Sequence, residues 1–312
     1  MQVILLFPGQ GSQKPGMGRD LAAEFPLARD VFDQIDVAVG APVSELCFNG
    51  PAEELTLTKN AQPALFAHGA AAWAVTRAML SPHVVAAAGH SLGELTAYYA
   101  AGTLTLTDGA ALVRRRGEVM FDIGSEKPGT MAAILGALTQ PIDDICAQAT
   151  LESGLVVPAN YNTEEQTVVS GEIPGVERAM ELAKQAGAKR ALRLSVSGAF
   201  HSPLMKPAEL AFSGAINRTD FSDPNFPVYS NVTEAPSIEA TSARSLLLRQ
   251  LTSPVRWMGE VRAMAARYPE ALYVELGPGS VLSGLIVRIV PGARTVACGT
   301  PADVESLSRM LV

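Results

Sequence analysis

The chain has 312 residues, of which 48% are hydrophobic and 18% are charged. This composition allows a large buried core and argues against disorder, and the length suits one large domain with an insertion or two modest domains. With a net charge of −7, the chain is a poor candidate for binding nucleic acid over a broad surface.

The cysteines and the N-terminal residues give an expectation for the compartment. Cys47, Cys146 and Cys298 are odd in number and form no C-x-x-C spacing, which suits a reducing compartment and argues against disulfides and zinc. The first residues have no basic region and Pro8-Gly9 ends their apolar run, so they predict a strand rather than a signal peptide. No run reaches the ~18–20 apolar residues of a membrane span. We expect a cytoplasmic protein with neither nucleic acid nor membrane as a partner.

Short apolar runs alternate with longer helical patterns, which predicts an α/β protein with a largely parallel sheet. In the first part of the chain, the pattern predicts strands over Val3–Phe7 and Val84–Ala88 and helices over Ala61–Met79 and Glu94–Ala101. Thr107-Asp108 is the expected N-cap of the helix that follows.

The pattern changes after residues 125–129. Strands are expected over 131–135, 156–160, 167–170 and 190–196, and helices over 141–149 and 176–186. This β-α-β-β-α-β order is the ferredoxin-like pattern. We predict a small domain of residues 127–195 inserted into a large domain made of residues 1–126 and 196–312.

The chain then returns to the large domain. The remaining elements expected there are helices over 205–216, 243–250 and 278–290 and strands over 228–230 and 268–277.

Gly89-His90-Ser91-Leu92-Gly93 fits G-x-S-x-G between an apolar strand and a helix. The glycines allow a tight turn that lifts the serine hydroxyl above the sheet. The next helix brings its N-terminal N–H groups beside the serine, where they can stabilise an oxyanion. A chance match to a glycine-rich turn is the alternative.

A serine nucleophile needs a base, and the chain has only four histidines. His90 adjoins Ser91, but neighbouring side chains diverge at a sharp turn, so we interpret it as a packing group. His68 in an apolar helix and His83 in a loop carry no special signal. His201 follows a strand, in a turn that could face Ser91, although an ordinary structural histidine is the competing interpretation.

Arg116 lies in an otherwise apolar helical region and can point inward. A buried guanidinium needs an anionic partner and suits a carboxylate. The alternative is a solvated cation at a helix end, which is our interpretation of Arg114 and Arg115.

Taken together, the motifs resemble malonyl-CoA:acyl-carrier-protein transacylases and the acyltransferase domains of polyketide synthases. The matching segments run in family order along nearly the whole chain: residues 7–13 (FPGQGSQ), 60–65 (NAQPAL), 89–94 (GHSLGE), 116–117 (RG), 160–162 (NYN), 166–171 (QTVVSG), 198–202 (GAFHS), 250–255 (QLTSPV) and 275–279 (ELGPG).

The resemblance implies the catalytic roles. Ser91 would be the nucleophile and His201 the general base. Gln10 and the N–H of Leu92 would form the oxyanion hole, and the Gln250 main-chain carbonyl would orient His201. The family fold is an α/β-hydrolase-like large domain with a parallel sheet and an inserted ferredoxin-like small domain.

The resemblance also implies the substrate site. Arg116 would bind the malonyl carboxylate and Gln62 would line the pocket. Met120 and Phe200 would restrict the acyl group, and Asn160 and Asn162 would frame the thioester end. Phe200 beside the histidine is similar to malonyl-selective members, whereas methylmalonyl-selective ones carry Tyr-Ala-Ser there.

The expected reaction has two half-reactions through malonyl-Ser91, hence ping-pong kinetics. The partners are malonyl-CoA and acyl carrier protein, and the resemblance implies no cofactor, since coenzyme A enters as substrate. A monomer is expected. Because such carriers are acidic, a basic patch must attract them, and Lys184, Lys189 and Arg190 in the small domain are the candidates.

Three alternatives stay open. A serine esterase or thioesterase of α/β-hydrolase type would place its histidine late, after the acid, and would not explain Arg116. A non-catalytic carrier-binding module would be expected to lose Ser91, His201 or Gln10. A transferase of a polyketide synthase or malonate decarboxylase is the third, although the length, without a fused segment, favours the loading step of fatty-acid synthesis.

Overall fold

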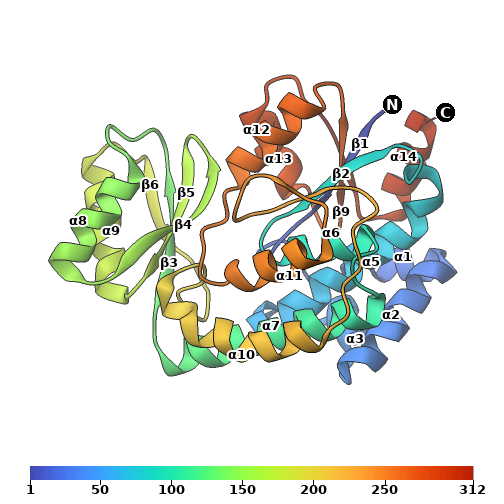
Figure 1. The fold of residues 1–312 in the computed structure, drawn as a ribbon, viewed down its shortest axis with the longest axis horizontal. Coiled ribbons are helices and arrows are strands. Elements are labelled where there is room, and N and C mark those ends of the chain that lie inside the picture. Colours follow the sequence, from blue (N-terminus) through green and yellow to red (C-terminus); the bar gives the residue numbers. More distant parts are fainter. Residues whose placement is uncertain (312) are drawn as a thin grey trace.

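The computed structural model describes residues 1–311 and contains two sheets, one in each half of the molecule shown in Figure 1. The larger sheet has the order β10-β9-β1-β2-β7-β8, in which only the β7–β8 pair is antiparallel. Its strands are β1 (Val3–Phe7), β2 (Val84–Gly89), β7 (Val228–Tyr229), β8 (Pro236–Ser237), β9 (Leu272–Leu276) and β10 (Arg294–Cys298).

The central strand β1 explains why this sheet is buried on both faces. Its five residues are all apolar and at most 1% exposed, as is typical of a strand inside a parallel sheet. Successive side chains point to opposite faces, so Leu5 and Phe7 enter one apolar cluster while Ile4 and Leu6 enter another. Both clusters need a covering layer of helices.

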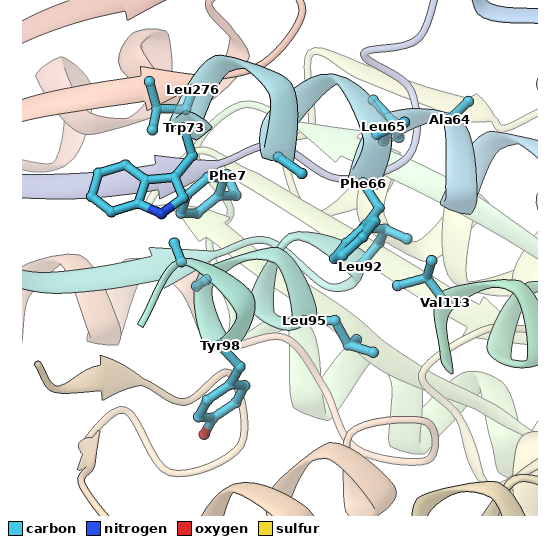
Figure 2. Packing of buried hydrophobic residues seen from close by; sticks show 14 of the residues in the cluster. Phe7, Ala64, Leu65, Phe66, Trp73, Leu92, Leu95, Tyr98, Val113 and Leu276 are labelled. Atoms are coloured by element: carbon cyan, nitrogen blue, oxygen red, sulfur yellow. The ribbon is translucent and has the colours of Figure 1, made fainter. Parts of the chain in front are cut away.

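Helices cover the two faces unequally. The Ile4 face is covered by α12 (Trp257–Arg267) and α13 (Val281–Ile289). The Phe7 face is covered directly by α5 (Thr58–Leu80), α6 (Leu92–Ala100) and α14 (Pro301–Leu311). Further helices extend the same apolar cluster by packing mainly on other helices: α1 (Arg19–Glu24), α2 (Pro26–Val39), α3 (Val43–Asn49), α4 (Ala52–Thr56), α7 (Leu106–Glu126), α10 (Lys206–Arg218) and α11 (Ala240–Arg249). Figure 2 shows Phe66 and Trp73 of α5 in one cluster with Phe7 and with Tyr98 of α6. Among the described residues, no helix is both long and apolar enough to span a bilayer.

The second sheet belongs to the ferredoxin-like unit that the sequence predicts. Its antiparallel order is β4-β5-β3-β6, and α8 and α9 pack on one face through a separate apolar cluster. The elements are β3 (Thr130–Leu135), α8 (Ile142–Ser153), β4 (Val156–Thr163), β5 (Gln166–Gly171), α9 (Ile173–Gln185) and β6 (Arg190–Arg193). The predicted fold class is confirmed. The division at 127 and 195 stays a proposal; α7 ends at Glu126 and β6 at Arg193.

Several sequence predictions need correction. The N-cap of α7 is Thr105 rather than Thr107, because the Thr105 hydroxyl oxygen accepts the Asp108 N–H at 3.1 Å. The strand expected from residue 268 begins at Leu272, because residues 268–271 form the turn that follows α12, in which the Ala271 N–H donates to the Tyr268 oxygen. Helices α1 to α4 and α14 and strand β10 were also not anticipated.

Strand β1 and helix α6 approach each other so closely that only glycine fits at position 93. A Cβ built on Gly93 would lie 1.9 Å from the main-chain oxygen of Phe7. The neighbouring Gly89 is similarly enclosed, since its Cβ would lie 1.9 Å from the Gly93 carbonyl carbon. The turn between β2 and α6 is therefore fixed by backbone contact.

We expect Gly93→Ala to lower the free energy of unfolding by about 3 kcal/mol or more, because overpacking at a backbone contact forces the strand and helix apart. Urea denaturation measures the change. Gly284→Ala is the matched control: Gly284 lies in α13 with open space around it, so alanine should stabilise by roughly 0.5–1 kcal/mol through helix propensity. Equal stability of the two variants would contradict this account of the turn.

Candidate active site

A cavity of about 380 Å³ lies between the two sheets and is lined by both parts of the chain. The part of the chain with the larger sheet contributes the turn after β1, the turn before α6 and one side of α13, whereas the part with the antiparallel sheet contributes β3, β4 and β5. The strands β1 and β2 end at this cavity, as expected for a site at the carboxyl edge of a parallel sheet.

Ser91 lies at the bottom of the cavity, in the turn between β2 and α6. Its backbone has φ 52° and ψ −106°, a conformation that costs a non-glycine residue on the order of 1–3 kcal/mol. The turn brings the Ser91 Oγ to 2.8 Å from the Nε2 of His201. The geometry gives the serine a base without an intervening group.

His201 is held by two main-chain carbonyls. Its Nδ1 lies 2.9 Å from the Gln250 oxygen and 3.1 Å from the Ser253 oxygen. Because carbonyls only accept, Nδ1 carries the hydrogen and Nε2 is left as the acceptor for the serine hydroxyl. Burial, and then the charge of Arg116, lower the pKa of His201 to about 3. The imidazole is therefore neutral near neutral pH. The resemblance pointed to the Gln250 carbonyl; Ser253 was missed.

Arg116 is buried, with 1% of its surface exposed, and its guanidinium faces Ser91. One terminal nitrogen donates to the Gln62 Oε1 at 2.8 Å, and the other donates to the Gln250 Oε1 at 2.8 Å and to the Ser91 Oγ at 3.1 Å. Burial lowers the pKa of Arg116 to about 10, and Glu94 opposes that shift, so the group stays charged. Arg114 instead pairs with Glu118 on the helix surface.

The side-chain amides of Gln62 and Gln250, whose oxygens bind Arg116, are each fixed by a second hydrogen bond from the amide nitrogen. The Gln62 Nε2 donates to the Met120 sulfur at 3.3 Å, and the Gln250 Nε2 donates to the Glu94 Oε2 at 2.6 Å. Both amide oxygens therefore face the guanidinium. Neither the side-chain contact of Gln250 nor the part played by Glu94 was predicted from the sequence, although Glu94 directly follows the G-x-S-x-G motif. Burial raises the pKa of Glu94 to about 7.

Gln10 and Leu92 both line the cavity, and their main-chain N–H groups are the expected oxyanion donors. Within residues 1–311, neither donates a hydrogen bond to another group of the chain, as an oxyanion site requires. The Gln10 side chain points to Thr58, whose hydroxyl lies 3.2 Å from the Gln10 Nε2 and 3.0 Å from the Ser197 Oγ.

The small-domain residues Asn160 and Asn162 close the opposite wall. The Asn162 Oδ1 lies 2.8 Å from the His90 Nε2, which accounts for His90 as a packing group beside the site. The main chain on either side of Asn160 pairs with Val255, since Tyr161 donates to the Val255 oxygen and Val255 donates to the Ala159 oxygen. These contacts join the two parts of the chain at the cavity. Met120 and Phe200 also line it.

The three basic residues expected to attract a carrier lie away from the cavity lining. Lys184 lies on α9, and Lys189 and Arg190 lie at the start of β6; all three are exposed. Arg190 is the cross-strand partner of Leu135, which is in turn the partner of Gln166. Cross-strand partners point to the same face of a sheet, so Arg190 lies on the face of Gln166, which lines the cavity. This is the face opposite α9. In the described part of the chain, no group of His, Cys, Asp or Glu is arranged to hold a metal ion.

Comparison with known proteins adds independent findings. Residues 4–298 match the family model described as acyl transferase domain. The malonyl CoA-acyl carrier protein transacylase of Bacillus subtilis is 42% identical over 97% of this chain and 95% of its own length, and that of Escherichia coli K12 is 40% identical over 96% and 97%.

Solved structures agree over the full length. The crystal structure of an acyl-carrier-protein S-malonyltransferase from Bartonella henselae is similar with a TM-score of 0.94 and 41% identity, covering 100% of this chain and 99% of that one. A malonyl-transacylase in complex with a type II polyketide acyl-carrier protein is similar with a TM-score of 0.92 and 37% identity, covering 98% of both.

Proposed function

The chain belongs to the acyl transferase domain family, and from that premise we propose that it moves a malonyl group from coenzyme A to the phosphopantetheine thiol of an acyl carrier protein. The observation that carries the proposal is the buried guanidinium of Arg116, which lies 3.1 Å from the Ser91 Oγ. A site with a carboxylate receptor beside the nucleophile suits an acyl group that ends in a carboxylate.

In the first half-reaction, the Ser91 Oγ attacks the thioester carbonyl while the Nε2 of His201 takes the serine proton. The N–H groups of Gln10 and Leu92 stabilise the oxyanion. The C–S bond then breaks, and His201 gives the proton to the departing coenzyme A sulfur. The product is a malonyl ester on Ser91.

The second half-reaction mirrors the first. His201 takes the proton of the carrier thiol, the sulfur attacks the ester carbonyl, and Ser91 leaves with the proton. Asn160, Asn162, Met120 and Phe200 frame the acyl group and limit access of water, which would hydrolyse the ester. The chain itself supplies base, oxyanion donors and carboxylate receptor, so we propose that no resident cofactor takes part.

We propose the loading step of fatty-acid synthesis, in the cytoplasm and by a monomer whose site comes from one chain. The three cysteines are free and buried, which suits a reducing compartment. The second candidate is supply of a polyketide carrier, because one similar structure is a complex with such a carrier. Comparing transfer to fatty-acid and polyketide carriers distinguishes the two. Arg116 argues against an esterase, which has no use for a buried guanidinium.

Mixing the protein with malonyl-CoA alone should add one malonyl group to Ser91, because the ester forms before a carrier is needed. Intact-mass spectrometry measures the addition, and peptide mapping locates it. Ser91→Ala should abolish the label, and Ser125→Ala, which changes a surface serine of α7, should retain it. A label that persists in Ser91→Ala would sink the nucleophile assignment.

Arg116→Ala should reduce kcat/KM for malonyl-CoA by roughly tenfold to a hundredfold or more while leaving acetyl-CoA unchanged or improved. Each charge-assisted hydrogen bond to the malonyl carboxylate is worth on the order of 1.5–3 kcal/mol. Self-acylation with both thioesters gives the ratio. Arg115→Ala, which changes an exposed arginine on the same helix, is the control. If the malonyl preference survives in Arg116→Ala, the carboxylate binds elsewhere.

We propose that Lys189 and Arg190, supported by Lys184, attract the acidic carrier. Lys189→Glu combined with Arg190→Glu should raise KM for the carrier several-fold and flatten its salt dependence, because steering depends on charge. Malonyl-CoA self-acylation should not change. The control reverses Arg29 and Arg309, which are exposed on α2 and α14. Equal damage to both half-reactions would contradict the docking assignment.

A further inference from the structure

Beneath Ser91 lies a fully buried asparagine that the reaction scheme does not use. Asn231 follows β7 and is 0% exposed. Its Oδ1 accepts the Ser91 N–H at 2.8 Å, and its Nδ2 donates to the Gly89 main-chain oxygen at 2.8 Å. One side chain therefore binds the main chain on both sides of His90, at the turn that carries the nucleophile.

The register of the sheet explains why these two groups need a partner. Strand β2 pairs in parallel with β7 through Ala87 with Val228 and Ala88 with Tyr229. Continued by two residues, this register would set position 231 opposite His90. In a parallel ladder, the N–H and C=O of one residue bind the residues on either side of the one opposite. The main chain of residue 231 would then bind Gly89 and Ser91.

The main chain of Asn231 is engaged elsewhere, so its side chain makes the pairing instead. The Asn231 N–H donates to the Glu94 Oε2 at 3.2 Å, and its carbonyl accepts the Arg256 N–H at 3.0 Å. The amide supplies a donor and an acceptor at the spacing of a peptide group. Aspartate lacks the donor and leucine lacks both, so the position suits asparagine.

Glu260 fixes which end of the amide faces the serine. The Asn231 Nδ2 also donates to the Glu260 Oε1 at 2.8 Å, and the Oδ1 also accepts from the Gln250 Nε2 at 3.2 Å. Glu260 on α12 is 0% exposed. The Asn231 Nδ2 faces two acceptors, and its Oδ1 faces two donors. If the amide were rotated by 180°, its nitrogen would face the donors and its oxygen the acceptors, and all four hydrogen bonds would be lost.

We propose that Asn231 is a positioning residue for the nucleophile: its side-chain amide replaces the strand pairing that β7 no longer supplies and holds Ser91 against His201. The inference rests on the proposed function, since it requires Ser91 to be the nucleophile. In the described chain, Asn231 makes no hydrogen bond with Arg116 and is linked to it only through the amide of Gln250. When Asn231 is lost, the Gln250 Nε2 keeps the Ser91 and Glu94 oxygens as acceptors, so its Oε1 stays on Arg116. Loss of Asn231 should therefore slow the chemical step and leave recognition of the carboxylate intact.

The test measures single-turnover malonylation of the full-length protein over a range of malonyl-CoA concentrations. In Asn231→Ala, the limiting rate constant should fall by on the order of a hundredfold, because small displacements of a reacting group have effects of that size. The malonyl-CoA concentration at half-maximal rate should stay within about threefold, and the malonyl-to-acetyl preference should not change. Thr76→Val removes a buried hydroxyl far from the site in α5 and should react like wild type.

A pair of variants at Glu260 separates positioning from loss of stability. Glu260→Gln keeps an acceptor for the Asn231 amide and should retain most of the rate, whereas Glu260→Leu removes it and should lower the rate at least tenfold. Thermal unfolding is recorded for every variant. If Asn231→Ala fails to fold, the ratio of the malonylation rates of Glu260→Gln and Glu260→Leu is the test. A rate at least tenfold higher in Glu260→Gln supports the positioning role, and equal rates overturn it.

The remaining outcomes are distinct. If wild type forms malonyl-Ser91 and Asn231→Ala forms it as fast as Thr76→Val, the positioning role is wrong and the proposed function stands. A changed malonyl preference in Asn231→Ala would also overturn the role, because it would mean action through the carboxylate site. If wild type forms no malonyl-Ser91, the proposed function itself fails.

Discussion

The site depends on the buried positive charge of Arg116, which no carboxylate of residues 1–311 contacts directly. Arg116 is surrounded by two amide oxygens and a hydroxyl, and the nearest acid, Glu94, reaches it only through the amide of Gln250. Burying a guanidinium is costly unless it is hydrogen-bonded or paired. The neutral amide oxygens of Gln62 and Gln250 reduce that cost, and they leave the positive charge unneutralised, whereas an ion pair would neutralise it. The arrangement keeps the charge in place and leaves it able to bind a carboxylate beside Ser91.

The same polar groups connect Arg116, the proposed carboxylate receptor, to Ser91 and His201, the proposed catalytic pair. Gln250 binds Arg116 with its side chain and His201 with its main chain, and its amide nitrogen also contacts the Ser91 carbonyl oxygen. Any displacement at the end of α11 must therefore disturb Arg116, His201 and Ser91 together. Groups coupled in this way act as a unit, and their effects on rate do not add. The core of α5, α6 and β1 provides the rigid support behind them.

The sequence predicts best what is determined locally. The turn around Ser91 follows from glycines and from the strand and helix on either side of it, and the order of small-domain elements follows from hydrophobic periodicity. His201 could not be selected by local pattern, because its contact with Ser91 spans 110 residues; the family resemblance was needed. Asn231, Glu94 and Glu260 gave no signal, since a buried polar side chain resembles a surface one until the fold brings its partners together. Helix α12 was missed although its buried residues Trp257, Val261 and Met264 recur at i, i+4 and i+7, the spacing of an amphipathic helix.

His201, the proposed base, is oriented by carbonyls of the peptide backbone instead of an acidic side chain. A carboxylate in that position would stabilise the protonated imidazole, whereas a neutral carbonyl does so less. A weaker base is adequate for an activated thioester but poorly suited to amides, which restricts the chemistry to the intended class of acyl donor. There is also an evolutionary consequence. The acceptors for His201 are the main-chain oxygens of Gln250 and Ser253, and every amino acid carries such an oxygen. A substitution at either position therefore leaves the acceptor atom in place. For the same reason, alanine scanning cannot detect the contribution of these two oxygens.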